Sequence, residues 1–457
     1  MNLQNKTAQL LDYINQAGAK HADVIAINSM DESVHVRHGK VESIEAERAQ
    51  GIGLRGFVET HKGLAFASAS SSDLSESGLK ALARQVVEMA RISEPDPDAV
   101  PPVGANHPDA SAIQAWQDKH PHTAHGWDTE AAKQAALACE AVAIEHQNVQ
   151  NSEGANASFS DNEQVYASSD GFIARNYKSS VSLSVSVIAG EHEGMQRDYA
   201  WHSALSAKGL RSPESIGQEA ASRAVARLGS KGIASRTCPV IFEPRIATSL
   251  VRHFLSAING RAVLQKQTFL ADAVGEQLFP SFVRIEENPD HVHGMANRLC
   301  DGEGTICQQR NLIEEGKLTS FLTDRYAAKR LNMEETGNAS RGLTGDIGIG
   351  TSNIILSGIG AAHVCSPDDI YHDIQHGFLV TELMGFGING VTGDYSRGAA
   401  GFLIEDGKIT RPVHEITIAG NLKDMFANIT HLGNDVTWFG STAVPSIAIS
   451  GMTIAGQ

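Results

Sequence analysis

The residues with the clearest chemical potential are two His-Glu pairs, His192-Glu193 and His414-Glu415. A zinc peptidase helix presents two imidazoles one turn apart, with a glutamate that activates water. Neither pair is followed by a second histidine at the spacing of a helical turn. We therefore expect both pairs to be structural or surface residues rather than metal ligands.

Two histidines and two cysteines form a second nominal set of metal ligands, namely His291, His293, Cys300 and Cys307. Their spacing fits no common zinc module, so chance proximity is the better interpretation. The set nevertheless leaves open a stand-alone hydrolase that binds one metal ion. The neighbouring run Asp301-Gly302-Glu303-Gly304 is typical of a turn that carries two solvated carboxylates.

Signatures of nucleophiles and of phosphate binding are weak. The chain has no G-x-S-x-G elbow, and the patterns at Ser340 and Ser396 lack a paired base at a predictable spacing. The glycine-rich run at 345–350 carries no Lys-Ser/Thr and does not open a helix, which favours a simple turn. The residues alone indicate no self-sufficient catalytic constellation.

Composition limits the class of protein. A chain of 457 residues predicts about three domains. Its net charge of −16 disfavours direct binding to nucleic acid, because an acidic surface repels phosphates. No apolar run reaches the roughly 20 residues of a membrane helix, and no basic and apolar leader opens the chain, so we expect a cytoplasmic protein without a membrane partner. Five scattered cysteines predict reduced thiols.

The elements that must position any site predict an α+β fold. Forty-three glycines indicate many turns and hence many strands. Two helix-sheet-helix N-terminal units are expected at 1–92 and 128–230, joined by a Pro/Asp/His-rich linker at 93–127. The first unit begins with a helix at 3–17 before Gly18, and the second begins after Asp128, a good N-cap. Short strands are predicted between the helices of each unit.

The remaining residues, 237–457, predict a large, mostly antiparallel, glycine-rich C-terminal sheet domain that opens with a strand and one amphipathic helix. Within it the segment 312–319 is echoed by 403–410, with an acidic residue and a glycine at the same turn position. This echo predicts two equivalent hairpins in one large sheet.

Several segments of this last domain resemble the TldD/PmbA family. The resemblance is carried by residues 390–407 and 412–422, and by the runs at 301–304, 312–316 and 336–339. It extends over essentially the whole chain. The resemblance implies a cytoplasmic zinc metallopeptidase system, first described as a modulator of DNA gyrase, in which a TldD subunit and a TldE (PmbA) subunit form a heterodimer around a chamber and degrade unfolded or small peptides.

Two departures from the TldD type indicate which subunit this chain resembles. TldD-type members carry His-Glu-x-x-x-His on the helix that opens the third segment, whereas residues 251–258 here retain only His253. They also carry a cysteine in a glycine-rich run near the C-terminus, and residues 435–445 have none. One imidazole cannot hold zinc by itself. The resemblance therefore implies a TldE (PmbA) subunit with no catalytic residue and no metal ligand of its own, and with zinc on the partner.

The implied role is to shape the chamber and a cleft whose sheet edge takes an extended peptide as an added strand. Asp394, Arg397 and Asn421 are the candidate substrate-binding residues, because polar groups on glycine-rich loops are free to face a peptide. Stabilisation of turns is the competing interpretation for these three residues. The implied partners are a TldD-type HExxxH subunit and unfolded peptides, with a homodimer possible without that subunit. The alternative function is a non-enzymatic modulator that acts on DNA gyrase or a toxin–antitoxin system.

Overall fold

The computed structural model describes residues 2–121, 124–344 and 347–456. Gly345 and Asp346 of the predicted glycine-rich turn, and residues 122–123 of the predicted linker, lie outside this description. The α-helices are α1 (Leu3–Ala17), α2 (Glu76–Ile92), α3 (Ala110–Lys119), α4 (Thr129–Glu145), α5 (Pro213–Ala226), α6 (Pro244–Ala257), α7 (Gly260–Leu264), α8 (Arg325–Leu331), α9 (Pro367–Ile374) and α10 (Leu422–Ala427). The prediction of a mixed, strand-rich fold is confirmed. No helix of the described residues is long and apolar enough to span a membrane.

The two N-terminal units share one antiparallel sheet in the order β3-β2-β1-β4-β5-β6. Its strands are β1 (His21–Arg37), β2 (Lys40–Thr60), β3 (Gly63–Ser71), β4 (Val149–Ser168), β5 (Ile173–Ala189) and β6 (Gln196–Ala204). Strands β1 and β4 pair directly from Asp23↔Ser168 to Val36↔Ala155. The two helix-sheet-helix units are therefore present, but they are joined edge to edge rather than being separate sheets.

The strands of this sheet are longer than the sequence pattern predicts. Strand β2 runs without interruption through the mostly polar residues 45–50, whose side chains are exposed. The sequence pattern missed this continuity because no large apolar side chain marks this part of the strand. The backbone pairing with β1 continues through it, apart from a shift in register at His35/Val36.

Each half of the long sheet has its own helices and its own core. Helices α1 and α2 pack on β2, β3 and the start of β1, while α4 and α5 pack on β4, β5, β6 and the end of β1. The predicted helix ends are confirmed, because Gly18 adopts a φ of 105° after α1 and the Asp128 side chain accepts a hydrogen bond from the backbone N–H of Ala131. These local signals fix where the helices start and stop.

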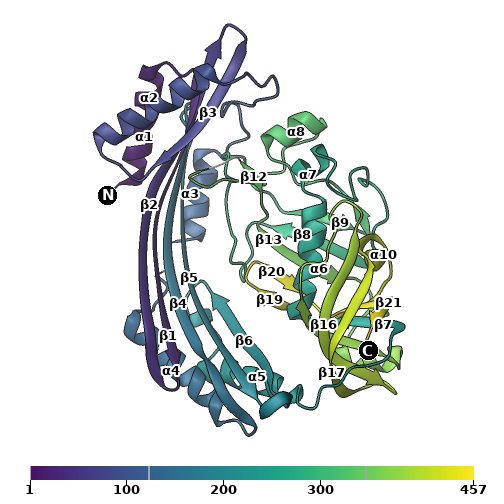
Figure 1. Cartoon of the computed structure of the whole chain (residues 1–457). Coiled ribbons are helices and arrows are strands. Elements are labelled where there is room, and N and C mark those ends of the chain that lie inside the picture. The colour runs from purple at the N-terminus through teal and green to yellow at the C-terminus, as the bar shows by residue number, and fades with distance from the viewer. Residues whose placement is uncertain (1, 122–123, 345–346, 457) are drawn as a thin grey trace.

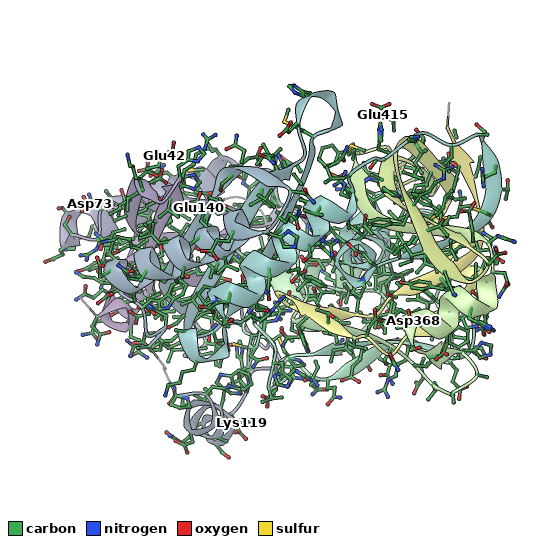
Figure 2. The ribbon with its side chains drawn as sticks, turned by 90° about the horizontal axis from the view of Figure 1, so that it is seen from below. Glu42, Asp73, Lys119, Glu140, Asp368 and Glu415 are labelled. Carbon is green, nitrogen blue, oxygen red and sulfur yellow. The ribbon has the colours of Figure 1, made fainter. Side chains whose placement is uncertain are left out.

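The segment at 93–127 contains a helix, α3, that the sequence pattern did not predict. Figure 2 shows α3, marked by Lys119, projecting from the body of the molecule. The residues before it are held against the C-terminal segment, because the Arg325 guanidinium donates hydrogen bonds to the carbonyls of Pro101 and Val103 at 2.7 and 3.1 Å. This stretch is thus fastened to the C-terminal half.

The C-terminal segment contains two main sheets and a short pair, β11 (Ala339–Ser340) with β12 (Gly348–Ile349). The six-stranded sheet has the order β10-β9-β8-β13-β20-β19. Its strands are β8 (Val283–Asn288), β9 (Arg310–Glu314), β10 (Lys317–Leu318), β13 (Asn353–Gly358), β19 (Thr437–Phe439) and β20 (Thr442–Val444).

The seven-stranded sheet closes on itself. Its strands are β7 (Arg236–Phe242), β14 (Val364–Cys365), β15 (Gly377–Met384), β16 (Asp394–Glu405), β17 (Lys408–Asn421), β18 (Ile429–Gly433) and β21 (Ile447–Ala455). Because β21 pairs with both β17 and β7, the strands β7, β15, β16, β17 and β21 form a closed ring. Closure removes most free edges from this part of the fold.

The two echoed segments do form hairpins, but in different sheets. The first links β9 to β10 and the second links β16 to β17. Glu315-Gly316 and Asp406-Gly407 all have positive φ, as a two-residue hairpin turn requires. The prediction of the turns is therefore right, while the prediction of one common sheet is wrong, because an eight-residue echo determines the turn and not the partners of its strands.

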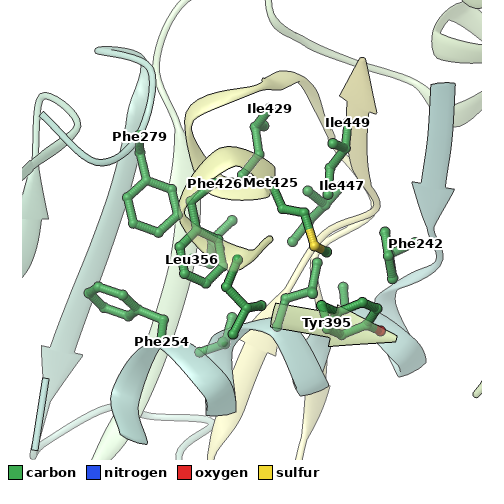
Figure 3. Packing of buried hydrophobic residues seen from close by; sticks show 14 of the residues in the cluster. Phe242, Phe254, Phe279, Leu356, Tyr395, Met425, Phe426, Ile429, Ile447 and Ile449 are labelled. Atoms are coloured by element: carbon green, nitrogen blue, oxygen red, sulfur yellow. The ribbon is translucent and has the colours of Figure 1, made fainter. Parts of the chain in front are cut away.

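An aromatic cluster packs under helix α6 (Figure 3). Phe254 meets Phe279 edge to face at 5.4 Å between ring centroids, and Phe279 stacks on Phe426 at 4.9 Å. Tyr395 of β16 belongs to the same buried core. These contacts hold one face of α6, and its opposite face lies on the side of the C-terminal segment that faces the long sheet (Figure 1).

Candidate functional site

Helix α6 presents a polar stripe on the face opposite its core contacts. Arg245, Ser249 and Arg252 follow one another at four- and three-residue spacing, so they lie along one side of the helix. Val251 and Phe254 are buried on the other side. The amphipathic pattern thus fixes the rotation of the helix and, with it, the direction of the stripe.

A cavity of about 340 Å³ lies between this stripe and strands β6, β15 and β16. We call it the arginine cavity. It is lined by Arg197, Asp198, Tyr199, Arg227, Arg245, Ile246, Ser249, Arg252, Thr381, Glu382, Leu383 and Arg397. Five arginines against two carboxylates make the lining strongly positive in a chain whose overall charge is negative.

Part of this charge is balanced by a buried ion-pair network around Asp198. Its carboxylate lies 3.0 Å from the Arg245 guanidinium, 3.5 Å from that of Arg227 and 3.6 Å from that of Arg223. Burial raises the pKa of Asp198, but the charges of Arg245 and Arg223 outweigh burial and hold the pKa below its usual value. Glu243 and Glu382 complete the network by pairing with Arg223 and Arg227.

Arg252 and Arg397 stand apart from this network. Within the described part of the chain, no carboxylate lies within 4 Å of either guanidinium. The Nε atom of Arg397 is buried and has no hydrogen-bond partner among the described residues. Two cationic side chains therefore border the cavity without a counter-charge.

His253 lies beside these two arginines and next to Tyr395. Its ring meets the Tyr395 ring edge-on at 6.2 Å between centroids. Burial, followed by the charges of Arg397 and Arg252, lowers the pKa of His253 from 6.5. The His253 Nε2 atom is buried and has no hydrogen-bond partner among the described residues.

We expect the folded chain to lose stability relative to a His253→Gln variant as the pH falls below 6.5. The unfolded state binds a proton at this histidine near pH 6.5, whereas the folded state resists it, so acid favours unfolding. The free energy of unfolding of the wild type should fall with pH by at most about 1.4 kcal/mol per pH unit more than that of the variant, because only one proton is involved. Chemical denaturation of both proteins between about pH 5 and pH 7.5 measures this difference. If the free energy of unfolding changes with pH equally in the two proteins, the role given to His253 is wrong.

The residues at this place do not fit a metal ion. Among the residues that the structure describes, no group of three His, Cys, Asp or Glu side chains lies close enough to hold one. The neighbours of His253 are the cations Arg252 and Arg397, which repel a divalent ion instead of neutralising it. The alternative metal set of His291, His293, Cys300 and Cys307 is likewise not brought together as a ligand group within the described part of the chain.

The structure separates the three candidate substrate-binding residues. Asp394 and Asn421 face each other across β16 and β17, with the Asn421 amide 3.3 Å from the Asp394 carboxylate. The Asn421 side chain also caps α10 by accepting a hydrogen bond from the Lys423 N–H at 3.0 Å. Arg397 lies an odd number of residues from Asp394, hence on the other face of β16, where it lines the arginine cavity. Their roles in binding a peptide remain predictions.

The run Asp301-Gly302-Glu303-Gly304 forms a turn, but its carboxylates are not solvated as predicted. Asp301 is 6% exposed and Glu303 is 3% exposed. Asp301 accepts hydrogen bonds from three backbone N–H groups, and Glu303 pairs with Arg55 at 3.2 Å. Burial and the adjacent Glu303 raise the pKa of Asp301 to about 7.

Sequence reasoning missed most of the arginine cavity. Asp198 and Thr381 lie far from α6 in the chain, and no short motif connects them. The arginine stripe of α6 was a usable signal, because three polar residues at helical spacing on an otherwise apolar helix mark a solvent-facing or ligand-facing side.

Comparisons with known proteins identify the family of this chain. The sequence matches three successive family models: PmbA/TldA metallopeptidase domain 1 over residues 22–90, the central domain over 124–228 and the C-terminal domain over 235–456. The protein named Metalloprotease PmbA from Escherichia coli O157:H7 is 35% identical over 436 residues, which cover 95% of this chain and 92% of that protein.

Solved structures share the whole fold. A protein from Bacteroides thetaiotaomicron, named as a candidate modulator of DNA gyrase, superposes with a TM-score of 0.86 at 24% identity and covers 99% of each chain. TldE from Thermococcus kodakarensis superposes with a TM-score of 0.84 at 21% identity, over 99% of this chain and 100% of that one. The resemblance found in the sequence is thereby confirmed, and the chain belongs to the TldD/PmbA metallopeptidase family.

Proposed function

We propose that this chain is a TldE (PmbA)-type subunit of a cytoplasmic zinc metallopeptidase that degrades unfolded or small peptides. Its partner is a TldD-type subunit that carries HExxxH and the zinc ion. In this assembly the present chain supplies no catalytic residue and no metal ligand, and instead shapes the chamber and the peptide cleft.

The arrangement of α6 is the observation that carries this proposal. Hydrolysis of an amide by a metallopeptidase needs a Lewis-acid metal and a general base. On α6 the solitary His253 is flanked by arginine charges, and its helix carries an arginine stripe where ligands of a cation would be acidic or neutral. A full-length relative named as a metalloprotease supports the peptidase context.

The outer edge of β6 borders the arginine cavity but is partly covered. The carbonyl of Arg197 accepts a hydrogen bond from Arg227 at 3.0 Å, and that of Tyr199 accepts one from Arg245 at 2.9 Å. These side chains occupy the acceptors that an added strand would use. A peptide that extends the sheet at β6 must displace them, which favours binding of an extended peptide at another edge.

Co-expression with a TldD-type subunit tests the division of labour. We expect a complex of equal stoichiometry that holds zinc, with less than about 0.1 zinc per chain when this subunit is purified alone. His253→Ala in this chain should leave the zinc content of the complex unchanged, because every zinc ligand is proposed to lie on the partner subunit.

A matched variant of the partner, with the histidines of HExxxH replaced by alanine, should remove the zinc. Loss of zinc in His253→Ala complexes would contradict the proposal. Recovery of DNA gyrase alone, with no TldD-type subunit, would support the non-enzymatic modulator in its place.

A further inference from the structure

The arginine cavity holds unused binding capacity for an anion. The guanidinium groups of Arg223, Arg227 and Arg245 are matched by Asp198, Glu243 and Glu382. Arg252 and Arg397 line the same cavity and have no such match among the described residues. Unbalanced cations beside a partly enclosed space of low dielectric constant attract and hold a negative ligand.

A strand bulge places the backbone of Thr381 at the wall of this cavity. In the ladder between β15 and β16, Val380 pairs with Gly401 and Glu382 pairs with Ala400, so Thr381 is the extra residue. Bulges of this kind redirect a side chain and often lie near functional sites. Thr381 is 5% exposed and lines the cavity, and its hydroxyl oxygen has no hydrogen-bond partner among the described residues.

The backbone at this bulge is already held in place. The carbonyl of Thr381 accepts a hydrogen bond from the Arg245 guanidinium at 2.9 Å, and Arg245 is itself fixed by Asp198. The ion-pair network therefore positions Thr381 without using its hydroxyl. The hydroxyl itself is covered by protein atoms, so the groups that can reach a ligand in the cavity are the two arginines.

We propose that the arginine cavity binds a carboxylate, held by Arg252 and Arg397, and that this carboxylate is the C-terminus of a bound peptide. Arginine suits a carboxylate because its planar fork of donors matches the two carboxylate oxygens. The volume of about 340 Å³ admits one terminal residue with its carboxylate. The choice of a peptide as the carrier rests on the proposed function, whereas the anion site itself does not.

Direct binding of dye-labelled hexapeptides to the purified full chain tests this proposal. The probe is an N-terminally labelled peptide of alanine and serine, prepared with a free C-terminal carboxylate or with a C-terminal amide, and binding is followed by fluorescence anisotropy. We expect the free acid to bind at least tenfold more tightly than the amide. Arg252→Gln and Arg397→Gln should each reduce this preference, and the double variant should abolish it.

Arg411→Gln is the matched control, because Arg411 is an exposed arginine of β17 that does not line the cavity. It should keep the full preference for the free acid. The melting temperatures of Arg252→Gln and Arg397→Gln should match the wild type, since neither guanidinium has an ion-pair partner to lose.

Three outcomes would overturn the proposal. They are equal binding of acid and amide, an unchanged preference in the double variant, and no binding of either peptide at millimolar concentration. A third probe, amidated but with one internal glutamate, separates the two sources of a carboxylate. If it binds as tightly as the free acid, the assignment to the C-terminus is wrong. The binding experiment does not measure cleavage, so a negative result would reject only the carboxylate site. The subunit role is tested separately by the zinc content of the complex.

Discussion

Replacing Asp23 with asparagine is expected to lower the free energy of the first cooperative unfolding transition by about 3–5 kcal/mol. Asp23 on β1 is fully buried and lies 2.6 Å from the guanidinium of Arg55 and 2.6 Å from that of Arg341. Arg55 comes from β2, whereas Arg341 comes from the C-terminal segment. The asparagine leaves Arg55 with Glu303 as its remaining ion-pair partner and leaves Arg341 with none among the described residues. The long sheet would thus lose its ion pair with Arg341, while the Arg55–Glu303 pair would remain as a charged link to the C-terminal half.

Glu59→Gln provides the matched control for this prediction. Glu59 pairs with Lys20 at the same distance, 2.6 Å, but both side chains are more than half exposed. Exposed pairs contribute little, so we expect a loss of less than about 1 kcal/mol. Denaturation with urea, followed by tryptophan fluorescence, measures both variants. Equal effects of the two substitutions would refute the structural role of Asp23.

The effect of Asp23→Asn should also depend on pH with a definite sign. Burial raises the pKa of Asp23, but the charges of Arg341 and Arg55 dominate and hold the pKa below 3.8. The carboxylate therefore stabilises the fold at pH values above 3.8, and this contribution is lost as the pH falls below that value. The difference between the wild type and the variant should narrow in acid.

Features set by neighbouring residues were predictable from the sequence. The end of α1 at Gly18, the start of α4 at Asp128 and the turns at Gly316 and Gly407 follow from local backbone geometry. Each depends on a few adjacent residues, so a pattern can reveal it. The family resemblance was equally accessible, because its blocks are continuous in the chain.

Features set by distant residues were not predictable in this way. Glu303 is buried because Arg55, which lies 248 positions earlier in the chain, neutralises it. Asp198 and Arg245 meet across 47 positions to build the arginine cavity. Sequence spacing carries no information about contacts between residues that are far apart in the chain. The carboxylates of the run at 301–304 were therefore predicted to be exposed to solvent. The separation of Asp394 from Arg397 likewise depends on which face of β16 each residue occupies.

The second large effect concerns catalysis. We expect the purified chain alone to hydrolyse no unfolded peptide, because α6 carries neither a second imidazole nor a carboxylate beside His253. Charged ligands placed among Phe254 and its buried neighbours would be costly without a metal ion to satisfy them. Activity should therefore depend entirely on a subunit that holds the metal ion.

The most direct test of the subunit role is peptide cleavage by this chain, by the TldD-type subunit and by their mixture, each with and without a chelator. The account predicts that this chain alone releases product no faster than buffer. The mixture should cleave the peptide at least about 100-fold faster than this chain alone, because a positioned general acid or base contributes a rate enhancement of at least that size. The chelator should abolish the activity of the mixture. Chelator-sensitive turnover by this chain alone, with no partner detectable in the preparation, would contradict the account.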